Sequence, residues 1–258
     1  MTSTMVGLAG VGKTFAGRAG NTVALTGIDL AIDEGEFVSL LGPSGCGKST
    51  LLRIIGDLLE PTTGEVKVNG KTPREARRDR DYGMVFQQAT LLEWRKVLRN
   101  IALPLEVMNL SNPEREQRAT EMLALVELSE FADHYPWQLS GGMQQRVAIA
   151  RALALQPELL LMDEPFGALD EMTRERMQME LMRIWQHTRT TVVFVTHSIP
   201  EAVFLSTRVV VMSPRPGRVV GIVDIDLPQP RLFETRENPR FFDKLNEVRE
   251  TLRRSGSQ

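Results

Sequence analysis

The sequence predicts an α/β fold in which a mostly parallel sheet carries a glycine-rich loop at the end of one strand. Short apolar runs alternate with longer segments of helical periodicity, as in chains that build a parallel sheet with helices between its strands. One apolar run leads directly into a glycine-rich loop, which an amphipathic segment follows. The 42% apolar and 25% charged residues are typical of a globular protein, and 258 residues can bury a substantial core.

The first part of the chain predicts strands and a helix around that loop. Apolar and polar residues alternate over 28–32, a turn follows at 34–35, and 37–41 is an apolar run. We therefore expect strand, turn and buried strand. Residues 51–59 have helical spacing, which Pro61 is expected to stop.

A helical block follows two short strands. Segments 64–70 and 82–88 have strand character, and we expect them to belong together to a small antiparallel sheet. From 91 to 156 the character is helical, with a helix start at Asn112 and Pro113, because proline suits the first helical turn. We expect this block to be inserted into the sheet.

The remaining elements complete the sheet. Two short buried strands, 159–163 and 191–196, are separated by a long predicted helix over 171–189. The segment 208–228 predicts two strands around a Pro-Arg-Pro-Gly turn. Beyond Pro230 we expect only charged residues of helical character.

Composition excludes several classes of function. A formal net charge of −2 gives no overall attraction to nucleic acid or anionic lipid. A single cysteine, Cys46, excludes an internal disulfide, and no Cys/His cluster suggests a metal site. No apolar run is long enough to span a bilayer, and the opening residues do not form a secretory leader. We expect a cytosolic chain unless another protein holds it at a membrane.

Two segments match the phosphate-loop pattern G-x-x-x-x-G-K-[S/T], namely 7–14 (GLAGVGKT) and 42–49 (GPSGCGKS). A phosphate loop needs a strand before it and a helix after it, so that the helix N-terminus faces the anion. Only the second match has both flanks. We interpret 42–49 as the phosphate loop and 7–14 as a coincidence.

The loop chemistry follows from its residue types. Glycines let backbone N–H groups converge on phosphate oxygens. Lys48 would reach the β- and γ-phosphates of a nucleotide, Ser49 would ligate Mg²⁺, and Thr50 could add a phosphate contact. Cys46 is a small filler with no chemistry of its own. The predicted binding segment is Gly42, Pro43, Ser44, Gly45, Cys46, Gly47, Lys48, Ser49 and Thr50.

Two strand ends carry further polar residues. Asp163 and Glu164 end one buried strand, where Asp163 suits Mg²⁺ and Glu164 could orient or deprotonate a water. The bland alternative is an acidic turn. His197 follows the strand at 191–196, and open α/β sheets bind ligands at such ends, although a lone histidine is more often structural. His134 and His187 are interpreted as surface or capping residues.

The segment 139–146 (LSGGMQQR) adds a second anion site without a lysine, because Ser140 can cap a helix whose first turn begins with Gly141 and Gly142. With this segment, the order of motifs resembles the ATP-binding-cassette ATPases along nearly the whole chain. The motifs, in family order, are GPSGCGKST, VFQQ, LSGGMQQR, LLLMDEP, GALD and VTH.

The resemblance assigns roles residue by residue. It implies that Phe15 stacks on adenine, although the spacing from Phe15 to the phosphate loop depends on the loop at 16–21. Gln87 would sense Mg²⁺ and the attacking water and link the site to a membrane partner. The remaining implied roles are γ-phosphate contacts across a dimer for Ser140, Gly141 and Gly142, the Mg²⁺ carboxylate for Asp163, the catalytic base for Glu164, the loop acid facing the neighbouring subunit for Asp170, and the switch histidine for His197.

The resemblance also implies architecture. A RecA-like core with an antiparallel β-subdomain would span about 1–88 and 158–230, an inserted helical signature subdomain about 89–157, and a short tail 231–258. Segment 7–14 would be an early edge strand that delivers Phe15 to the adenine. Since each family ATP lies between the phosphate loop of one subunit and the signature of another, single copies of both motifs imply a homodimer.

The expected function is that of the ATPase subunit of an importer. The segment 91–95 and the tail MSPRPGRVV resemble the nitrate, sulfonate, taurine and bicarbonate import group, although Glu93 stands where those relatives commonly have proline. The implied cofactors are ATP and Mg²⁺. The implied partners are a second copy, transmembrane permease subunits and, indirectly, a substrate-binding protein, at the cytoplasmic face of the inner membrane. No nucleic acid is expected. The alternative is a soluble ATP-dependent switch without transport.

One apolar group has two interpretations. Leu91, Leu92, Trp94, Val97 and Leu98 follow Gln87 closely. They could pack within the helical subdomain or form a groove for a coupling helix of a membrane subunit, and the sequence leaves both possibilities open.

Overall fold

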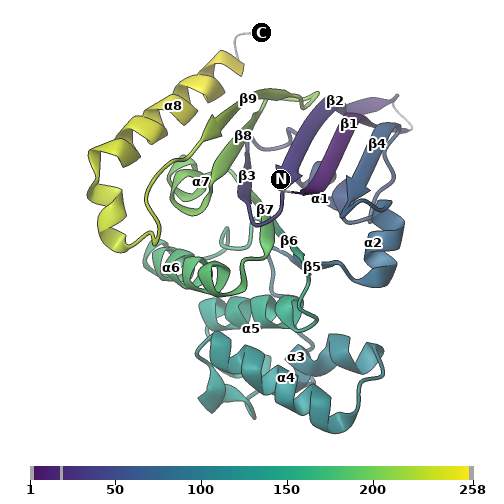
Figure 1. Cartoon of the computed structure of the whole chain (residues 1–258), viewed down its shortest axis with the longest axis vertical. Coiled ribbons are helices and arrows are strands. Elements are labelled where there is room, and N and C mark those ends of the chain that lie inside the picture. Colours follow the sequence, from purple (N-terminus) through teal and green to yellow (C-terminus); the bar gives the residue numbers. More distant parts are fainter. Residues whose placement is uncertain (1–2, 18–19, 256–258) are drawn as a thin grey trace.

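The computed structural model describes residues 3–17 and 20–255, whose strands form two sheets (Figure 1). One sheet is mostly parallel and lies at the centre of the molecule, and the other is antiparallel and lies beside it. Helices cover both faces of the central sheet, as expected for an α/β fold. In these two described ranges no helix is both long and apolar enough to cross a bilayer.

The central sheet has the order β5-β6-β7-β3-β8-β9 within the described residues. All pairs are parallel except β8–β9. Every residue of β3, β6 and β7 is buried, which explains their continuous apolar runs. The strands are β3 (Phe37–Leu41), β5 (Tyr82–Val85), β6 (Leu159–Asp163), β7 (Thr191–Thr196), β8 (Arg208–Met212) and β9 (Val219–Asp224).

The antiparallel sheet has the order β2-β1-β4, with β1 (Thr4–Phe15), β2 (Thr22–Asp33) and β4 (Thr63–Val68). The expectation that segments 64–70 and 82–88 share this sheet is wrong. β4 pairs with β1, whereas β5 pairs in parallel with β6 in the central sheet. Helix α2 (Pro73–Asp79) carries the chain from one sheet to the other, and the spacing of two short strands does not reveal such a crossover.

Segment 7–14 lies inside β1. This strand is the middle strand of its sheet, not the edge strand that the resemblance implied, because β2 and β4 pair on its two sides. Most of its backbone pairs with the two neighbouring strands, and at the irregularity around Gly10 the N–H donates to Asp29 Oδ1 at 2.7 Å. The structure thus agrees that the match to the phosphate-loop pattern is coincidental.

Helix α1 (Lys48–Ile55) follows the phosphate loop as predicted, but it ends before the expected position at residue 59. Gly56 caps its C-terminus, and Asp57 has a left-handed φ of 49°. Local backbone turning therefore ends the helix well before Pro61, and Leu58 is left 49% exposed.

The helical block contains α3 (Val97–Val107), α4 (Asn112–Leu125) and α5 (Gly141–Leu153), which lie together at one end of the molecule (Figure 1). Helix α4 begins at Asn112 as predicted. Ser111 and Glu114 form a reciprocal capping box there, because the Glu114 carboxylate accepts a hydrogen bond from the Ser111 N–H at 3.0 Å.

The C-terminal segment is more than a charged tail. Helices α6 (Glu171–Thr188), α7 (Ile199–Leu205) and α8 (Pro239–Ser255) cover the central sheet on the side away from β1 and β2 (Figure 1). Within α8, Phe241, Leu245 and Val248 are buried in the core. The expectation of only charged residues beyond Pro230 is therefore wrong, because apolar residues at helical spacing recur among the charges.

Candidate functional site: a nucleotide-phosphate site at the carboxyl edge of the sheet

The loop between β3 and α1 has the backbone that a phosphate cradle needs. Gly45 and Gly47 have φ values of 78° and 104°, in the region that L side chains rarely adopt. Gly47 is the N-cap of α1, so the helix N-terminus opens onto the loop. A Cβ on Gly47 would lie 2.6 Å from Leu25 Cδ2, and one on Gly42 would lie 2.9 Å from the Met212 carbonyl oxygen. Both positions therefore require glycine.

Lys48 is buried within this loop at 4% exposure. Its Nζ donates hydrogen bonds to the carbonyl oxygens of Gly42 at 2.8 Å and Pro43 at 3.1 Å. These hydrogen bonds hold the ammonium group at the loop and offset the cost of burying its charge. The Cys46 side chain packs into the core, and burial raises the pKa of its thiol, in agreement with a filler role.

A cavity of about 280 Å³ lies over the loop. Phe15, the last residue of β1, is 38% exposed and forms part of the wall. The structure thus brings Phe15 to the phosphate loop, although residues 18 and 19 of the connecting loop lie outside the described residues. The lining residues are Phe15, Thr22, Ala24, Ser44, Gly45, Gly47, Lys48, Ser49, Thr50, Glu164 and Arg215.

Arg215 is a member of this wall that sequence reasoning missed. It comes from the turn between β8 and β9, which reaches the loop because Gly217 and β2 are hydrogen-bonded: the Gly217 N–H donates to the Ala24 carbonyl at 2.9 Å. The Pro-Arg-Pro-Gly sequence predicted this turn but not its destination. The arginine adds a cation to an anion site.

Ser49, which lines the cavity, is paired with Asp163. The Ser49 hydroxyl donates a hydrogen bond of 2.6 Å to Asp163 Oδ1. Asp163 is only 8% exposed, and its nearest cation is the Arg53 guanidinium at 3.9 Å. A hydroxyl and a carboxylate are the ligand types that Mg²⁺ takes together with substrate phosphates, so these two residues fit the ion.

Glu164 and His197 meet beside that pair. His197 Nδ1 lies 3.1 Å from Glu164 Oε2. The two residues follow β6 and β7, which are neighbours in the sheet, and the Glu164 N–H donates to the Val195 carbonyl. Glu164 has a φ of 46°, an uncommon value for a residue with a side chain. Such strain persists where the surroundings fix it and is typical of functional positions.

Gln87 lies just after β5 and next to the segment that follows Glu164. A Cβ on Gly167 would be 3.0 Å from Gln87 Nε2. The signature helix α5 holds this region in place. Gln145 donates to the Phe86 carbonyl at 3.0 Å, and Arg151 donates to the carbonyls of Ala89 and Thr90. The sequence motifs assign no role to Gln145 or Arg151.

The signature residues lie elsewhere. Ser140 caps α5 by accepting a hydrogen bond from the Met143 N–H at 3.4 Å, as predicted. Ser140 and Gly142 line a separate cavity of about 350 Å³, and no phosphate-loop residue is among the residues found to line it. Asp170 caps α6 through the Thr173 N–H at 3.0 Å, and this hydrogen bond lowers the pKa of the Asp170 carboxyl.

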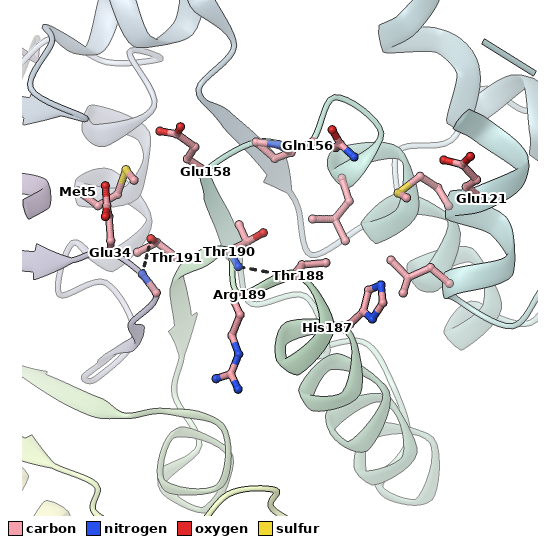
Figure 2. Close-up of a pocket in the computed structure, with 15 residues that line it drawn as sticks. Met5, Glu34, Glu121, Gln156, Glu158, His187, Thr188, Arg189, Thr190 and Thr191 are labelled. Atoms are coloured by element: carbon pink, nitrogen blue, oxygen red, sulfur yellow. Dashed lines mark hydrogen bonds between the residues drawn. The ribbon is translucent and has the colours of Figure 1, made fainter. Parts of the chain in front are cut away.

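A larger cavity of about 810 Å³ lies at the opposite edge of the sheet (Figure 2). Glu158 and Thr191, which line it, stand at the amino ends of β6 and β7, whereas Asp163 and His197 stand at the carboxyl ends. His187 lies at this cavity on the last turn of α6, so it is remote from the loop. In α/β sheets ligands bind at the carboxyl edge, which favours the smaller cavity as the nucleotide site.

Comparisons with known proteins identify the family of the chain. A family profile described as "ABC transporter" matches residues 25–167. The taurine import ATP-binding protein TauB of Rhizobium johnstonii is 49% identical over 245 residues, which cover 92% of each chain. The nitrate import ATP-binding protein NrtD of Synechocystis sp. is 44% identical over 247 residues, covering 93% of this chain and 92% of that one.

A solved structure extends the likeness to three dimensions. The dimeric, post-hydrolysis state of the cassette MJ0796 bound to ADP and Pi superposes with a TM-score of 0.74 and 42% identity, covering 86% of this chain and 99% of that one. The profile match spans more than half of the chain, and both relatives align over nearly their whole length. The chain therefore belongs to the ATP-binding-cassette (ABC) transporter family, as one of its ATP-hydrolysing subunits.

Proposed function

We propose that this chain is the ATPase subunit of an importer and couples ATP hydrolysis to uptake of a small solute such as nitrate, a sulfonate or taurine. The observation that carries the ATPase role is the meeting of two pairs, Ser49 with Asp163 and Glu164 with His197, at the edge of one phosphate loop. The names of TauB and NrtD support the importer role.

The residues divide the chemistry between them. The loop amides and Lys48 bind the β- and γ-phosphates, and Phe15 stacks on the adenine. When bound, Mg²⁺ neutralises charge on the phosphates, and Ser49 and Asp163 would hold it, with Gln87 as a further proposed ligand. Glu164 orients a water and accepts its proton as the water attacks the γ-phosphorus, and ADP leaves with the former bridging oxygen.

His197 and Glu164 support each other in this step. The imidazole Nδ1–H can donate to the Glu164 carboxylate, which leaves the other ring nitrogen for the γ-phosphate or the water. The hydrogen bond also fixes the direction of the carboxylate. This contact supports a role for both groups in holding the water for in-line attack.

We also propose that two copies complete two sites. Ser140, Gly141 and Gly142 would contact the γ-phosphate bound to the partner subunit, and Asp170 would face that subunit across the interface. The separate location of the signature cavity and the dimeric state of the MJ0796 structure support this arrangement. The proposed interface is isologous, because each chain contributes its phosphate loop to one site and its signature residues to the other.

A membrane subunit would dock near Gln87. A cavity of about 400 Å³ lies between β5 and α3, and Tyr82, Leu103 and Val107 are among the residues that line it. Of the apolar group at 91–98, Val97 is fully buried in the core, whereas Trp94 is 74% exposed. Both interpretations therefore apply to different residues of the group. Val97 packs within the helical block, whereas Trp94 is accessible to a partner at the cytoplasmic membrane face.

The test is reconstitution with the candidate permease and binding protein in vesicles. We expect ATP-dependent solute uptake that Glu164→Gln abolishes, while Trp94→Ala weakens the complex but leaves basal hydrolysis by the free ATPase intact. If the chain never associates with a membrane subunit in any nucleotide state, the importer role is wrong.

A further inference from the structure

A buried carboxylate that the hydrolytic step does not use lies behind the site. Glu201, on α7, is only 6% exposed and is not among the residues found to line the nucleotide cavity. Its Oε2 accepts a hydrogen bond from the Thr196 hydroxyl, and its Oε1 accepts one from Gln178 Nε2 at 3.1 Å. Burial raises the pKa of Glu201. A group of this kind costs stability unless its position matters to the fold or the site.

Thr196 connects Glu201 to the backbone around His197. Its hydroxyl oxygen also accepts a hydrogen bond from the Ser198 N–H at 3.0 Å. Glu201 thus contacts the residues immediately before and after His197, since its own N–H also donates to the Ser198 hydroxyl at 3.4 Å. This short stretch of backbone carries the His197 ring, whose Nδ1 lies 3.1 Å from Glu164 Oε2.

Gln178 connects Glu201 to residues 231–238, which are called the C-terminal segment from here on. This α6 residue is 3% exposed, and its Oε1 accepts a hydrogen bond from Arg236, in the 3-10 helix η3 (Phe233–Glu237). Arg236 also pairs with Glu175 at 3.2 Å, and its guanidinium lies 4.3 Å from the centroid of the Phe204 ring on α7. Arg236 therefore contacts both helices that flank the chain of hydrogen bonds.

Arg231 attaches the same segment to the C-terminal end of α7. It is 2% exposed, and it donates to the carbonyl oxygens of Val203 at 3.0 Å, Phe204 at 2.7 Å and Ile225 at 3.2 Å. Burial lowers its pKa to about 10, so it stays protonated at neutral pH. The C-terminal segment is thereby attached to α7 at its end and, through Arg236, along its side.

We propose that Arg236, Gln178 and Glu201 are positioning residues through which the C-terminal segment holds His197 in its hydrolytic orientation. The contacts run without a gap from Arg236 to Gln178, Glu201, Thr196 and the Ser198 amide. A partner that displaces the segment at 231–238 would slow hydrolysis without touching the nucleotide. The inference rests on the proposed role of His197.

Steady-state hydrolysis and equilibrium ATP binding test the chain of contacts. Arg236→Ala and Glu201→Ala should lower kcat about three- to thirtyfold and leave the Kd for ATP unchanged. Glu201→Gln leaves a side-chain amide that can hydrogen-bond with Gln178 and Thr196, so this variant should keep most of the wild-type kcat. Arg240→Ala is the matched control, since Arg240 lies on α8 in an exposed ion pair with Asp226. All variants are assayed well below their melting temperatures.

A double-mutant cycle separates positioning from general stability. In a His197→Ala background, Arg236→Ala should have no further effect on kcat, because the contact acts only through that histidine. An equal further loss there, or an equal loss in Arg240→Ala, overturns the inference. If His197→Ala alone keeps the full rate, the proposed role of His197 is wrong instead.

Discussion

His197 Nδ1 lies 3.1 Å from Glu164 Oε2, although the two residues are 33 positions apart in the chain. They meet because β6 and β7 are parallel neighbours and both end at the same edge of the sheet. The contact joins the proposed base to the group that would sense the γ-phosphate. We therefore expect substitutions at each of the two residues to change the rate of hydrolysis.

Glu164→Gln should leave ATP affinity unchanged and lower kcat by about 10²- to 10⁴-fold, because an amide cannot accept the proton of the attacking water. ATP should then accumulate in a stable dimer. Phosphate release, equilibrium binding and light scattering measure the three quantities. Glu65→Gln is the control, since Glu65 is exposed on β4 and pairs with the exposed Lys67. A monomer with normal turnover would falsify the assignment of Glu164.

Lys48→Ala should weaken ATP binding about tenfold to a hundredfold, the range for losing a charge-assisted phosphate contact. The substitution also leaves the Gly42 and Pro43 carbonyls without their donor, so a lower melting temperature is expected. Lys67→Ala removes an exposed lysine of β4 and serves as control. Unchanged affinity in Lys48→Ala, measured by calorimetry, would exclude 42–49 as the phosphate loop.

Removal of Mg²⁺ by a chelator should abolish turnover, and Ser49→Ala should raise the Mg²⁺ concentration needed for half-maximal activity. The reason is that the hydroxyl, 2.6 Å from Asp163 Oδ1, is proposed to be a ligand of the ion together with that carboxylate. A Mg²⁺ titration of hydrolysis at saturating ATP measures the shift. Thr120→Ala, which removes an exposed hydroxyl of α4, is the control, and an equal shift in both variants would argue against a specific ligand at Ser49.

Much of this site could be predicted from sequence because its pieces are local. The phosphate loop, the Asp163–Glu164 strand end and the Ser140 cap each depend on a few consecutive residues. Arg215, Gln145 and Glu201 were missed because their positions depend on which elements pack together. The assignment of the strand at 82–88 to the antiparallel sheet failed for the same reason, since partner choice in a sheet is a long-range property.

Gly47→Ala should destabilise the fold by about 1–3 kcal/mol and weaken ATP binding, because φ is 104° and the new Cβ would lie 2.6 Å from Leu25. Denaturant unfolding gives the free energy. Gly70→Ala is a matched control: its φ is 72°, but nothing lies within 4 Å of the added Cβ. The difference between the variants isolates the contact with Leu25. Equal losses would mean that backbone strain alone sets the effect.

Phe15→Ala should weaken ATP binding about tenfold while leaving tripolyphosphate binding unchanged, because aromatic stacking on a base contributes about 1–3 kcal/mol and acts only on the adenine. Phe15 is suited to this contact, since it ends β1, is 38% exposed and lines the same cavity as Lys48 and Ser49. Phe15→Tyr keeps the ring and should keep the affinity. Competition binding with both ligands distinguishes the possibilities. If Phe15→Ala weakens tripolyphosphate as strongly as ATP, the substitution disturbs the phosphate loop; if it weakens neither, another residue holds the base.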